Sequence, residues 1–299
     1  MKKPLAGAAF AVLLIGGAMA APATAAGQSD APAPAKQHTA QQKQQQKPQQ
    51  KKPKAKAVDF AGTVALSNCS GSVVRVPDSK PEDPALVMSN GHCLESGFPG
   101  PGEVVVDQPS SRSFTLLDSS GGDAGTVKAS KVAYATMTDT DVSLYQLTST
   151  YADIESKYGI KALELNAAHP EQGKAITVVS GYWKKMYKCS VDGFVYNLKE
   201  GQWTWKDSVR YTPDCQTIGG TSGSPVVDDA TGKVVAVNNT GNEDGQECTD
   251  NNPCEVDENG KVTVRKGINY AQETYIIVPC IGAGNKIDLG REGCTLPKP

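Results

Sequence analysis

Short runs rich in valine, isoleucine and tyrosine recur along residues 58–299, and clusters of glycine, proline, aspartate and serine separate them. Runs of this kind, bounded by turn-forming residues, are typical of an antiparallel sandwich or barrel. They cover residues 63–66, 71–76, 103–107, 113–117, 175–180, 191–198, 234–238 and 269–277. Residues 151–165 differ, because their helical propensity predicts a helix that bridges two halves. The pattern therefore predicts an all-β fold.

The N-terminus has the features of a secretory signal peptide over residues 1–25. Lys2 and Lys3 precede an apolar stretch, and Ala23-Thr24-Ala25 is a small-residue cleavage site, with Ala18-Met19-Ala20 as the alternative. No later segment is long and apolar enough to span a bilayer. The mature chain is therefore expected to be secreted, either free outside the cell or associated with the cell wall.

Residues 26–57 are rich in glutamine, lysine and proline, without apolar periodicity, and are predicted to form a disordered linker before a single domain at 58–299. From residue 27 the tract carries seven lysines against one aspartate. One interpretation is weak contact of this basic tether with surface polyanions. The composition favours the other, a solvated spacer or propeptide remnant.

All of the cysteines follow the linker, and an even count in an exported chain predicts disulfides. They are Cys69, Cys93, Cys189, Cys215, Cys248, Cys254, Cys280 and Cys294. Nearest-neighbour pairing (189–215, 248–254 and 280–294) is the simplest arrangement for the last six. Paired Cys-x-x-Cys spacings are absent from the sequence, so no metal and no cofactor is expected.

A glycine-rich turn at residues 219–226 places Ser222 before a valine-rich strand. A nucleophilic serine needs little bulk around it, and it needs backbone N–H groups turned toward the carbonyl that it attacks. Ser222 is the candidate nucleophile, and Ser224 is the competing candidate directly before Pro225.

His92 is the candidate general base among only three histidines. His38 lies in the low-complexity tract, and His169 precedes Pro170 in an expected connecting loop. Asp141 then enters an alternating apolar strand, where a half-buried carboxylate can orient an imidazole through its Nδ1–H.

The motifs Asn90-Gly91-His92-Cys93, Asp141-Val142-Ser143-Leu144-Tyr145 and Gly220-Thr221-Ser222-Gly223-Ser224-Pro225 occur in the order His, Asp, Ser. With them the chain resembles the chymotrypsin-like (trypsin-like) serine peptidases of bacterial secreted type, over roughly residues 58–280. The resemblance implies two antiparallel six-stranded β-barrels, about 58–150 and about 166–299, with the active site in the cleft between them. It also implies a Cys69–Cys93 disulfide that holds the histidine loop.

The resemblance implies a catalytic triad of His92, Asp141 and Ser222, and an oxyanion hole formed by the N–H groups of Gly220 and Ser222. Thr221 departs from the family, in which aspartate often pairs with a newly cut N-terminus. Threonine cannot form that ion pair, so the site is expected to form without activation cleavage.

The family pattern places the base and walls of the substrate pocket at Gln216, Thr217, Asn238, Asn239, Thr240 and Gly241. None of these side chains is charged, so a polar, neutral pocket without strong preference for arginine or lysine is predicted. The alternative is that a locally shifted loop brings the carboxylate of Asp214 into the pocket. Trp203, Trp205 and Tyr211 form either a substrate platform or, as period-two aromatics favour, one face of a strand. The acidic stretch 242–257 is interpreted as a solvated hairpin pinned by two cysteines rather than a calcium loop.

The sequence predicts a monomeric serine endopeptidase that takes protein or peptide substrates, with no nucleic-acid partner. The alternative is a catalytically inert, protease-like binding module at the cell surface. Retention of histidine, aspartate and serine in the family order favours the enzyme.

Overall fold

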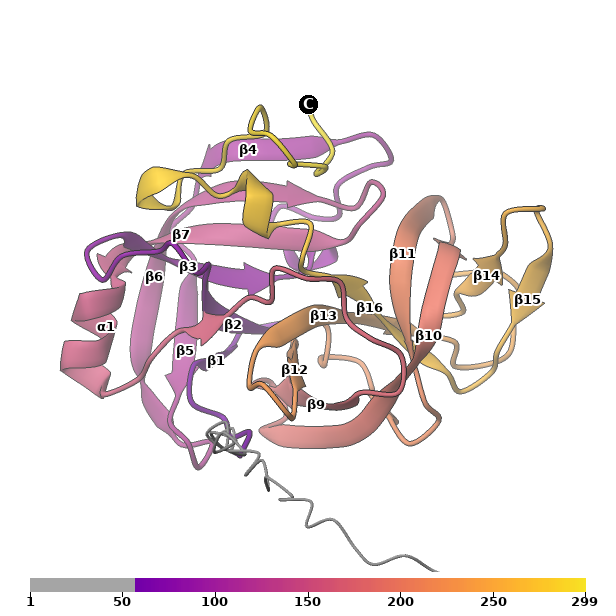
Figure 1. Ribbon diagram of the computed structural model, residues 1–299, viewed down its shortest axis with the longest axis horizontal. Helices are drawn as coiled ribbons and strands as arrows, with labels where there is room; N and C mark the ends of the chain where they lie inside the picture. Colours follow the sequence, from indigo (N-terminus) through magenta and orange to yellow (C-terminus); the bar gives the residue numbers. More distant parts are fainter. Residues whose placement is uncertain (1–56) are drawn as a thin grey trace, which may run out of the picture. The chain divides into compact units, whose positions relative to one another are not determined.

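The computed structural model describes residues 57–299, in which strands predominate. The predicted signal peptide and the linker up to residue 56 lie outside the described residues. Figure 1 shows two groups of strands, the first coloured indigo to magenta and the second mostly orange. No helix in residues 57–299 is both long and apolar enough to cross a membrane.

Six strands of the first group close into a barrel, because β1 pairs with both β2 and β5. The ring consists of β1 (Thr63–Ala65), β2 (Ser70–Arg75), β3 (Pro84–Ser89), β7 (Val142–Thr150), β6 (Asp123–Thr136) and β5 (Ser113–Leu117). Two further strands extend it: β4 (Val104–Pro109) pairs with β6, and the short β8 (Leu163–Glu164) lies parallel to β2.

The second group closes in the same way, because β11 pairs with both β10 and β16. Its ring consists of β9 (Ala175–Ser180), β10 (Lys185–Glu200), β11 (Trp203–Tyr211), β16 (Asn269–Glu273), β13 (Val234–Gly241) and β12 (Pro225–Asp228). The hairpin of β14 (Cys254–Val256) and β15 (Val262–Val264) extends from β10. The predicted fold class, two antiparallel six-stranded barrels, is confirmed.

Adjacent apolar residues on one strand are buried in two different hydrophobic clusters. Val73 on β2 and Val87 on β3 lie in the core of the first barrel. Their neighbours Val74 and Leu86 belong to a second buried cluster that also contains Val227 of β12. Successive side chains of a strand point to opposite faces, so a continuous valine run is buried when both faces are covered. The barrels are therefore joined by an apolar interface.

The helix α1 (Tyr151–Tyr158) is shorter than predicted from the sequence. It begins with a capping box, in which Thr150 Oγ1 accepts the N–H of Asp153 at 3.1 Å and the Asp153 carboxylate accepts the N–H of Thr150 at 2.9 Å. It ends at Gly159, whose φ of 67° is left-handed. The predicted helical range to residue 165 is therefore wrong at its end, where β8 begins instead.

All four disulfides have the expected partners: Cys69–Cys93, Cys189–Cys215, Cys248–Cys254 and Cys280–Cys294. The last one closes the C-terminal segment, whose Ile281 and Leu296 are buried in the cluster between the barrels. The hydroxyl of Tyr134, on β6, donates to the carbonyl of Pro297 at 3.0 Å. Residues after β16 therefore pack on the first barrel (Figure 1), although the sequence placed them with the second.

Candidate active site

His92 lies in a 3₁₀ turn, Gly91–Cys93, that follows β3. The turn packs so closely on β6 that a Cβ at Gly91 would lie 2.2 Å from the Thr136 carbonyl oxygen, and only glycine avoids this clash. On the other side, the Cys69–Cys93 disulfide ties the turn to the residue before β2. The backbone position of His92 is therefore held from both sides.

Asp141 precedes β7 and is completely buried. Its Oδ2 lies 2.6 Å from His92 Nδ1, and its Oδ1 accepts the backbone N–H of His92 at 3.1 Å. The side-chain amide of Asn90 donates to the backbone carbonyl of Asp141 at 2.8 Å. This hydrogen bond holds the backbone of Asp141 in place. A carboxylate beside Nδ1 favours the tautomer that is protonated there, so Nε2 is left as a proton acceptor.

The pKa of His92 is raised above its ordinary value. Burial by itself lowers this pKa, but the charge of Asp141, its hydrogen bond and the charge of Glu200 together raise it by more. The side chain is 20% exposed. The imidazole is thus a stronger base than a free histidine and still has access to a ligand.

Two left-handed glycines shape the loop around Ser222. Gly220 has a φ of 85° and Gly223 a φ of 81°. A Cβ at Gly223 would lie 2.1 Å from the Ser70 carbonyl oxygen, so the loop can pack against β2 only with glycine there. The backbone N–H of Ser70 in turn donates to the Ser222 carbonyl at 2.8 Å. The first barrel therefore holds the serine loop of the second.

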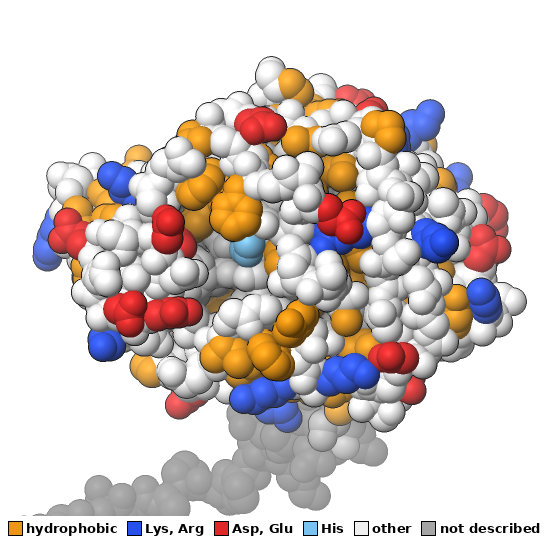
Figure 2. All heavy atoms as spheres, turned by 180° about the vertical axis from the view of Figure 1, so that it is seen from behind, with side chains coloured by type: hydrophobic (Ala, Val, Ile, Leu, Met, Phe, Trp, Pro, Cys, Tyr) orange, Lys and Arg blue, Asp and Glu red, His pale blue; other side chains and the backbone are white. Residues whose placement is uncertain are grey.

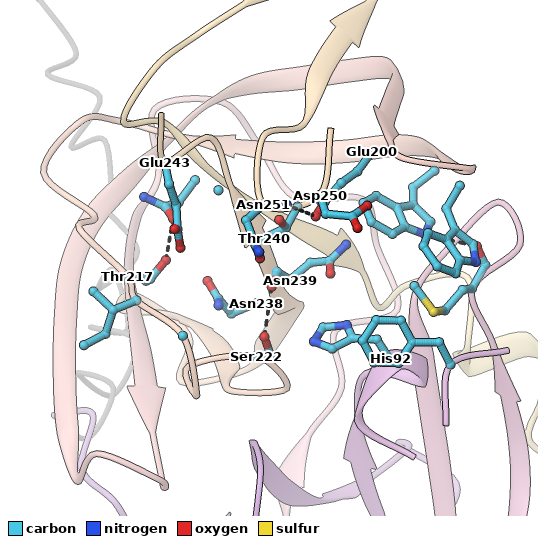
Figure 3. A pocket seen from close by; sticks show the side chains of 18 residues that line it. His92, Glu200, Thr217, Ser222, Asn238, Asn239, Thr240, Glu243, Asp250 and Asn251 are labelled. Carbon is cyan, nitrogen blue, oxygen red and sulfur yellow. Dashed lines mark hydrogen bonds between the residues drawn. The ribbon is translucent and has the colours of Figure 1, made fainter. Parts of the chain in front are cut away.

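The structure separates the two candidate serines. Ser224 is completely buried, and its hydroxyl donates to the Thr221 carbonyl at 2.6 Å. Ser222 lines a cavity, and its hydroxyl donates to the Asn239 carbonyl at 3.2 Å. Figure 3 shows Ser222 and His92 facing each other across this cavity. Only Ser222 is open to a bound molecule.

The N–H groups of Gly220 and Ser222 donate to no acceptor within residues 57–299. Thr221, between them, is completely buried, and its Oγ1 accepts the N–H of Ile218 at 3.3 Å. The Thr221 side chain therefore stabilises the turn by a hydrogen bond within residues 218–221. Neither the Gly220 nor the Ser222 N–H group is used by the hydrogen bonds of residues 57–299.

The cavity has a volume of about 360 Å³. Of the predicted pocket residues it is lined by Thr217, Asn238, Asn239, Thr240 and Gly241. Gln216 does not line it, because its exposed side chain turns back and donates to the Pro213 carbonyl at 2.6 Å.

Side chains from distant segments complete the walls. Phe98, Met137, Trp203 and Trp205 form an apolar side next to His92. The ring of Phe98 contacts the rings of His92 and Trp203 edge-on, with centroids 5.7 and 5.9 Å apart. The tryptophans alternate along β11 as predicted for a strand face, and that face is a wall of the cavity.

Three carboxylates, Glu200, Glu243 and Asp250, also line the cavity, whereas no lysine or arginine is among its described lining residues. The prediction of a neutral pocket is therefore wrong. Glu243 and Asp250 come from the acidic stretch 242–257, which the sequence analysis assigned to a solvated hairpin. The excess of acids was visible in the sequence, but that two of them line the same cavity as Ser222 depends on how this segment folds.

Two of the lining side chains have buried polar atoms without a hydrogen-bond partner among residues 57–299. Glu200 accepts the N–H of Asn251 on its Oε1 at 2.7 Å, while its Oε2 is unpartnered. Both side-chain polar atoms of Asn239 are unpartnered, although the residue is only 4% exposed. Buried polar groups are rarely left without partners, so this side of the cavity is suited to a polar ligand.

Burial raises the pKa of Glu200, while the nearby Thr240 hydroxyl, the hydrogen bond from Asn251 and the charge of His92 lower it; the net change is upward. Cys69 and Cys93 also lie beside His92. Their disulfide removes the thiolates that a zinc ion would need, so the three do not form a metal centre.

Comparison with known proteins gives one family and a set of similar folds. Residues 69–237 match the trypsin-like peptidase domain. No curated protein matches the chain. One similar solved structure is the MamO protease domain from Magnetospirillum magneticum, with 15% identity, a TM-score of 0.45, and coverage of 73% of this chain and 95% of that one.

Two others are the active form of the Rv3671c protease from M. tuberculosis and the thermostable serine protease AL20 from an extremophilic microorganism. The first has 13% identity and a TM-score of 0.45, covering 81% of this chain and 85% of that one. The second has 14% identity and a TM-score of 0.43, covering 72% and 91%. The assignment does not rest on these distant likenesses but on the family match over more than half of the sequence: the chain belongs to the trypsin-like peptidase domain family.

Proposed function

We propose that the protein is a secreted serine endopeptidase with Ser222 as nucleophile, His92 as general base and Asp141 as the residue that orients the base. The observation that carries this proposal is the 2.6 Å contact between His92 Nδ1 and the fully buried Asp141 carboxylate, in a cavity that His92 shares with Ser222. The pairing leaves Nε2 free to accept a proton on the side of the cavity.

The proposed reaction begins when the Ser222 hydroxyl turns from the Asn239 carbonyl toward His92 Nε2. The hydroxyl oxygen attacks the peptide carbonyl as its proton passes to Nε2, and the Asp141 carboxylate stabilises the resulting imidazolium. The free N–H groups of Gly220 and Ser222 donate to the developing oxyanion, and loss of one such donor typically costs 10²–10³ in kcat. His92 then protonates the leaving amine, and water hydrolyses the acyl-enzyme by the same route in reverse.

A basic side chain is proposed for the substrate residue that enters the cavity. Glu200, Glu243 and Asp250 supply negative charge, and the apolar side next to His92 can pack along an aliphatic stem. A guanidinium or ammonium group would give the unpartnered Glu200 Oε2 and Asn239 Oδ1 the donors that they lack. Trp203 and Phe98 add aromatic surface that favours a cation.

The alternative is an inert binding module that uses the same cavity without turnover. A fluorophosphonate probe separates the two, because it labels only a serine activated by its base. We expect stoichiometric labelling of the wild type at Ser222 and none of Ser222→Ala or His92→Ala. An unlabelled but folded wild type that still binds peptides would establish the binding module instead.

Export and an extracellular location are part of the proposal. Four disulfides, with no free cysteine in residues 57–299, suit an oxidising compartment. Residues 1–25 would be removed as a signal peptide, and residues 26–57 would form a linker to the peptidase domain. N-terminal sequencing of secreted material tests this, since a mature chain that retains residues 1–25 would contradict it.

A further inference from the structure

His169, Asp207 and Glu273 form a cluster in the second barrel, apart from the proposed catalytic cavity. His169 lies in the segment between β8 and β9, Asp207 on β11 and Glu273 at the end of β16. One ligand atom from each lies within 4.8 Å of the others. Strands β11 and β16 are hydrogen-bonded neighbours, so the cluster joins a connecting segment to two paired strands.

The histidine presents its second ring nitrogen, Nε2, to both acids, and this nitrogen also lies 3.4 Å from Asp207 Oδ1. Its Nδ1 lies 2.7 Å from the Pro170 carbonyl oxygen, which can only accept, so this nitrogen carries the proton of the neutral ring. Nε2 then offers a lone pair, and it lies 3.2 Å from Asp207 Oδ2 and 3.2 Å from Glu273 Oε1. The rings of Phe194 and Tyr275 pack against the imidazole and hold its orientation, with centroids 4.4 and 5.2 Å away.

Glu273 is an independent sign that a cation belongs here. Its side chain is only 2% exposed, yet neither carboxylate oxygen accepts a hydrogen bond from a residue within 57–299. A buried carboxylate without hydrogen bonds is costly, and such charges are normally paired or bound to a metal. Nε2 lies 3.2 Å from this carboxylate, and no lysine or arginine within residues 57–299 forms an ion pair with Asp207 or Glu273.

The spacing suits a tetrahedral metal. Zinc binds imidazole nitrogen and carboxylate oxygen at about 2.0–2.2 Å, and ligands at tetrahedral angles are then about 3.3–3.5 Å apart. The two separations from His169 Nε2, 3.2 Å each, are near this value, and the two acids' ligand atoms lie within 4.8 Å of each other. The hydroxyl of Tyr275 donates to Asp207 Oδ2 at 3.1 Å, a contact of the kind that orients a metal-binding carboxylate.

We propose that His169, Asp207 and Glu273 bind a divalent transition-metal cation, with zinc as the reference ion. One neutral imidazole and two carboxylates balance its charge, and the partly exposed His169 and Asp207 leave room for water as a further ligand. Bound metal would cross-link the segment before β9 to β11 and β16. The absence of paired Cys-x-x-Cys spacings counts against zinc bound by cysteine thiolates. It does not bear on this cluster, which contains no cysteine.

The site is tested by adding zinc to the purified secreted protein. Calorimetry measures the affinity and the number of sites, and thermal unfolding measures the change in melting temperature. We expect one tight site and a rise in melting temperature of roughly 5–10 °C at a hundredfold excess over Kd. His169→Ala and Glu273→Gln should each remove both effects. Cobalt, used as a spectroscopic probe, should give the intense visible bands of a tetrahedral site in the wild type but not in His169→Ala or Glu273→Gln.

Two control variants show whether a loss of zinc binding is specific to the cluster. Glu171→Gln changes an exposed acid of the same segment, paired with Lys174, and should bind zinc as the wild type does. His92→Ala should also retain the site, which excludes binding at the proposed catalytic histidine. The proposal is overturned if wild type binds no zinc, or if folded His169→Ala binds it with unchanged affinity.

Discussion

Ser70 of the first barrel donates its backbone N–H to the carbonyl of Ser222 at 2.8 Å, directly across the interface between the barrels. Its hydroxyl lies 3.1 Å from the Gly220 carbonyl oxygen and accepts the N–H of Tyr182 at 3.0 Å. Ser70 also follows Cys69, whose disulfide holds the His92 turn. One residue therefore connects the support of the proposed base to the loop of the proposed nucleophile.

Ser70→Ala should lower kcat by roughly tenfold with little change in KM, because the serine loop loses the contact that positions Gly220. The unpaired groups left behind should cost about 1–3 kcal/mol in the free energy of unfolding. Ser72→Ala is the matched control, since Ser72 is equally buried on the same strand and its hydroxyl has no partner among residues 57–299. Steady-state kinetics and urea unfolding would count against this role if both variants behaved alike.

Ser222→Ala should abolish hydrolysis, with a loss on the order of 10⁶ in kcat, while folding persists. Ser224→Ala should retain measurable activity, because its hydroxyl is turned to the Thr221 carbonyl and away from the cavity. Single-turnover assays with a peptide ester distinguish the variants. Activity in Ser222→Ala and its complete loss in a folded Ser224→Ala would show that the nucleophile is misassigned.

Activity should fall as the pH drops through the raised pKa of His92, because the protonated imidazole cannot accept the serine proton. Glu200→Gln removes one of the charges that raise this pKa, so the acid limb of the kcat/KM profile should move to lower pH. Glu95→Gln changes an exposed acid shortly after the His92 turn, whose charge has no part in the shift, and should leave the limb in place. An unmoved limb in Glu200→Gln would exclude this coupling.

Peptides with arginine should be cleaved roughly 10–100-fold faster than matched peptides with citrulline at one position near the scissile bond, since a charged hydrogen bond contributes about 1.5–3 kcal/mol. Glu200→Gln should reduce this ratio more than it reduces cleavage of the citrulline peptide. A positional peptide library with mass-spectrometric readout identifies the position. Efficient cleavage without charge preference at any position would refute the acidic cavity as a specificity pocket while leaving the peptidase assignment intact.

Residues 26–57 should not be needed to form the active site, because the buried Thr221 offers no carboxylate to a new N-terminal amine. A chain that begins near Lys56 with an arbitrary first residue should therefore hydrolyse peptides about as fast as the long form. Comparison of the two purified forms, with the N-terminus checked by mass spectrometry, measures this. A silent long form that a single cut near residue 57 switches on would establish an inhibitory prosegment.

Local sequence was sufficient where the physical cause is local. Turn residues between short apolar runs predicted the strands, and the order of cysteines suggested pairings that the structure has. Two ring strands were not predicted, the short β3 and the long β6. In β6, exposed and small residues such as Gly125 and Lys128 obscure the apolar pattern. The end of α1 was likewise decided by Gly159 against the helical propensity beyond it.

The sequence by itself determined the all-β fold, the family motifs and the short glycine turns that carry His92 and Ser222, because backbone sterics and strand periodicity act between near neighbours. Only the tertiary structure decided what surrounds those side chains. Gln216 turned out of the cavity, while Glu200 and Asp250 entered it from β10 and the loop before β14. His169, read as an ordinary loop histidine, came to face Glu273 across more than a hundred residues of chain. Charge in a pocket or a cluster depends on which distant segments pack together, and that packing is set by burial across the whole domain rather than by any local pattern.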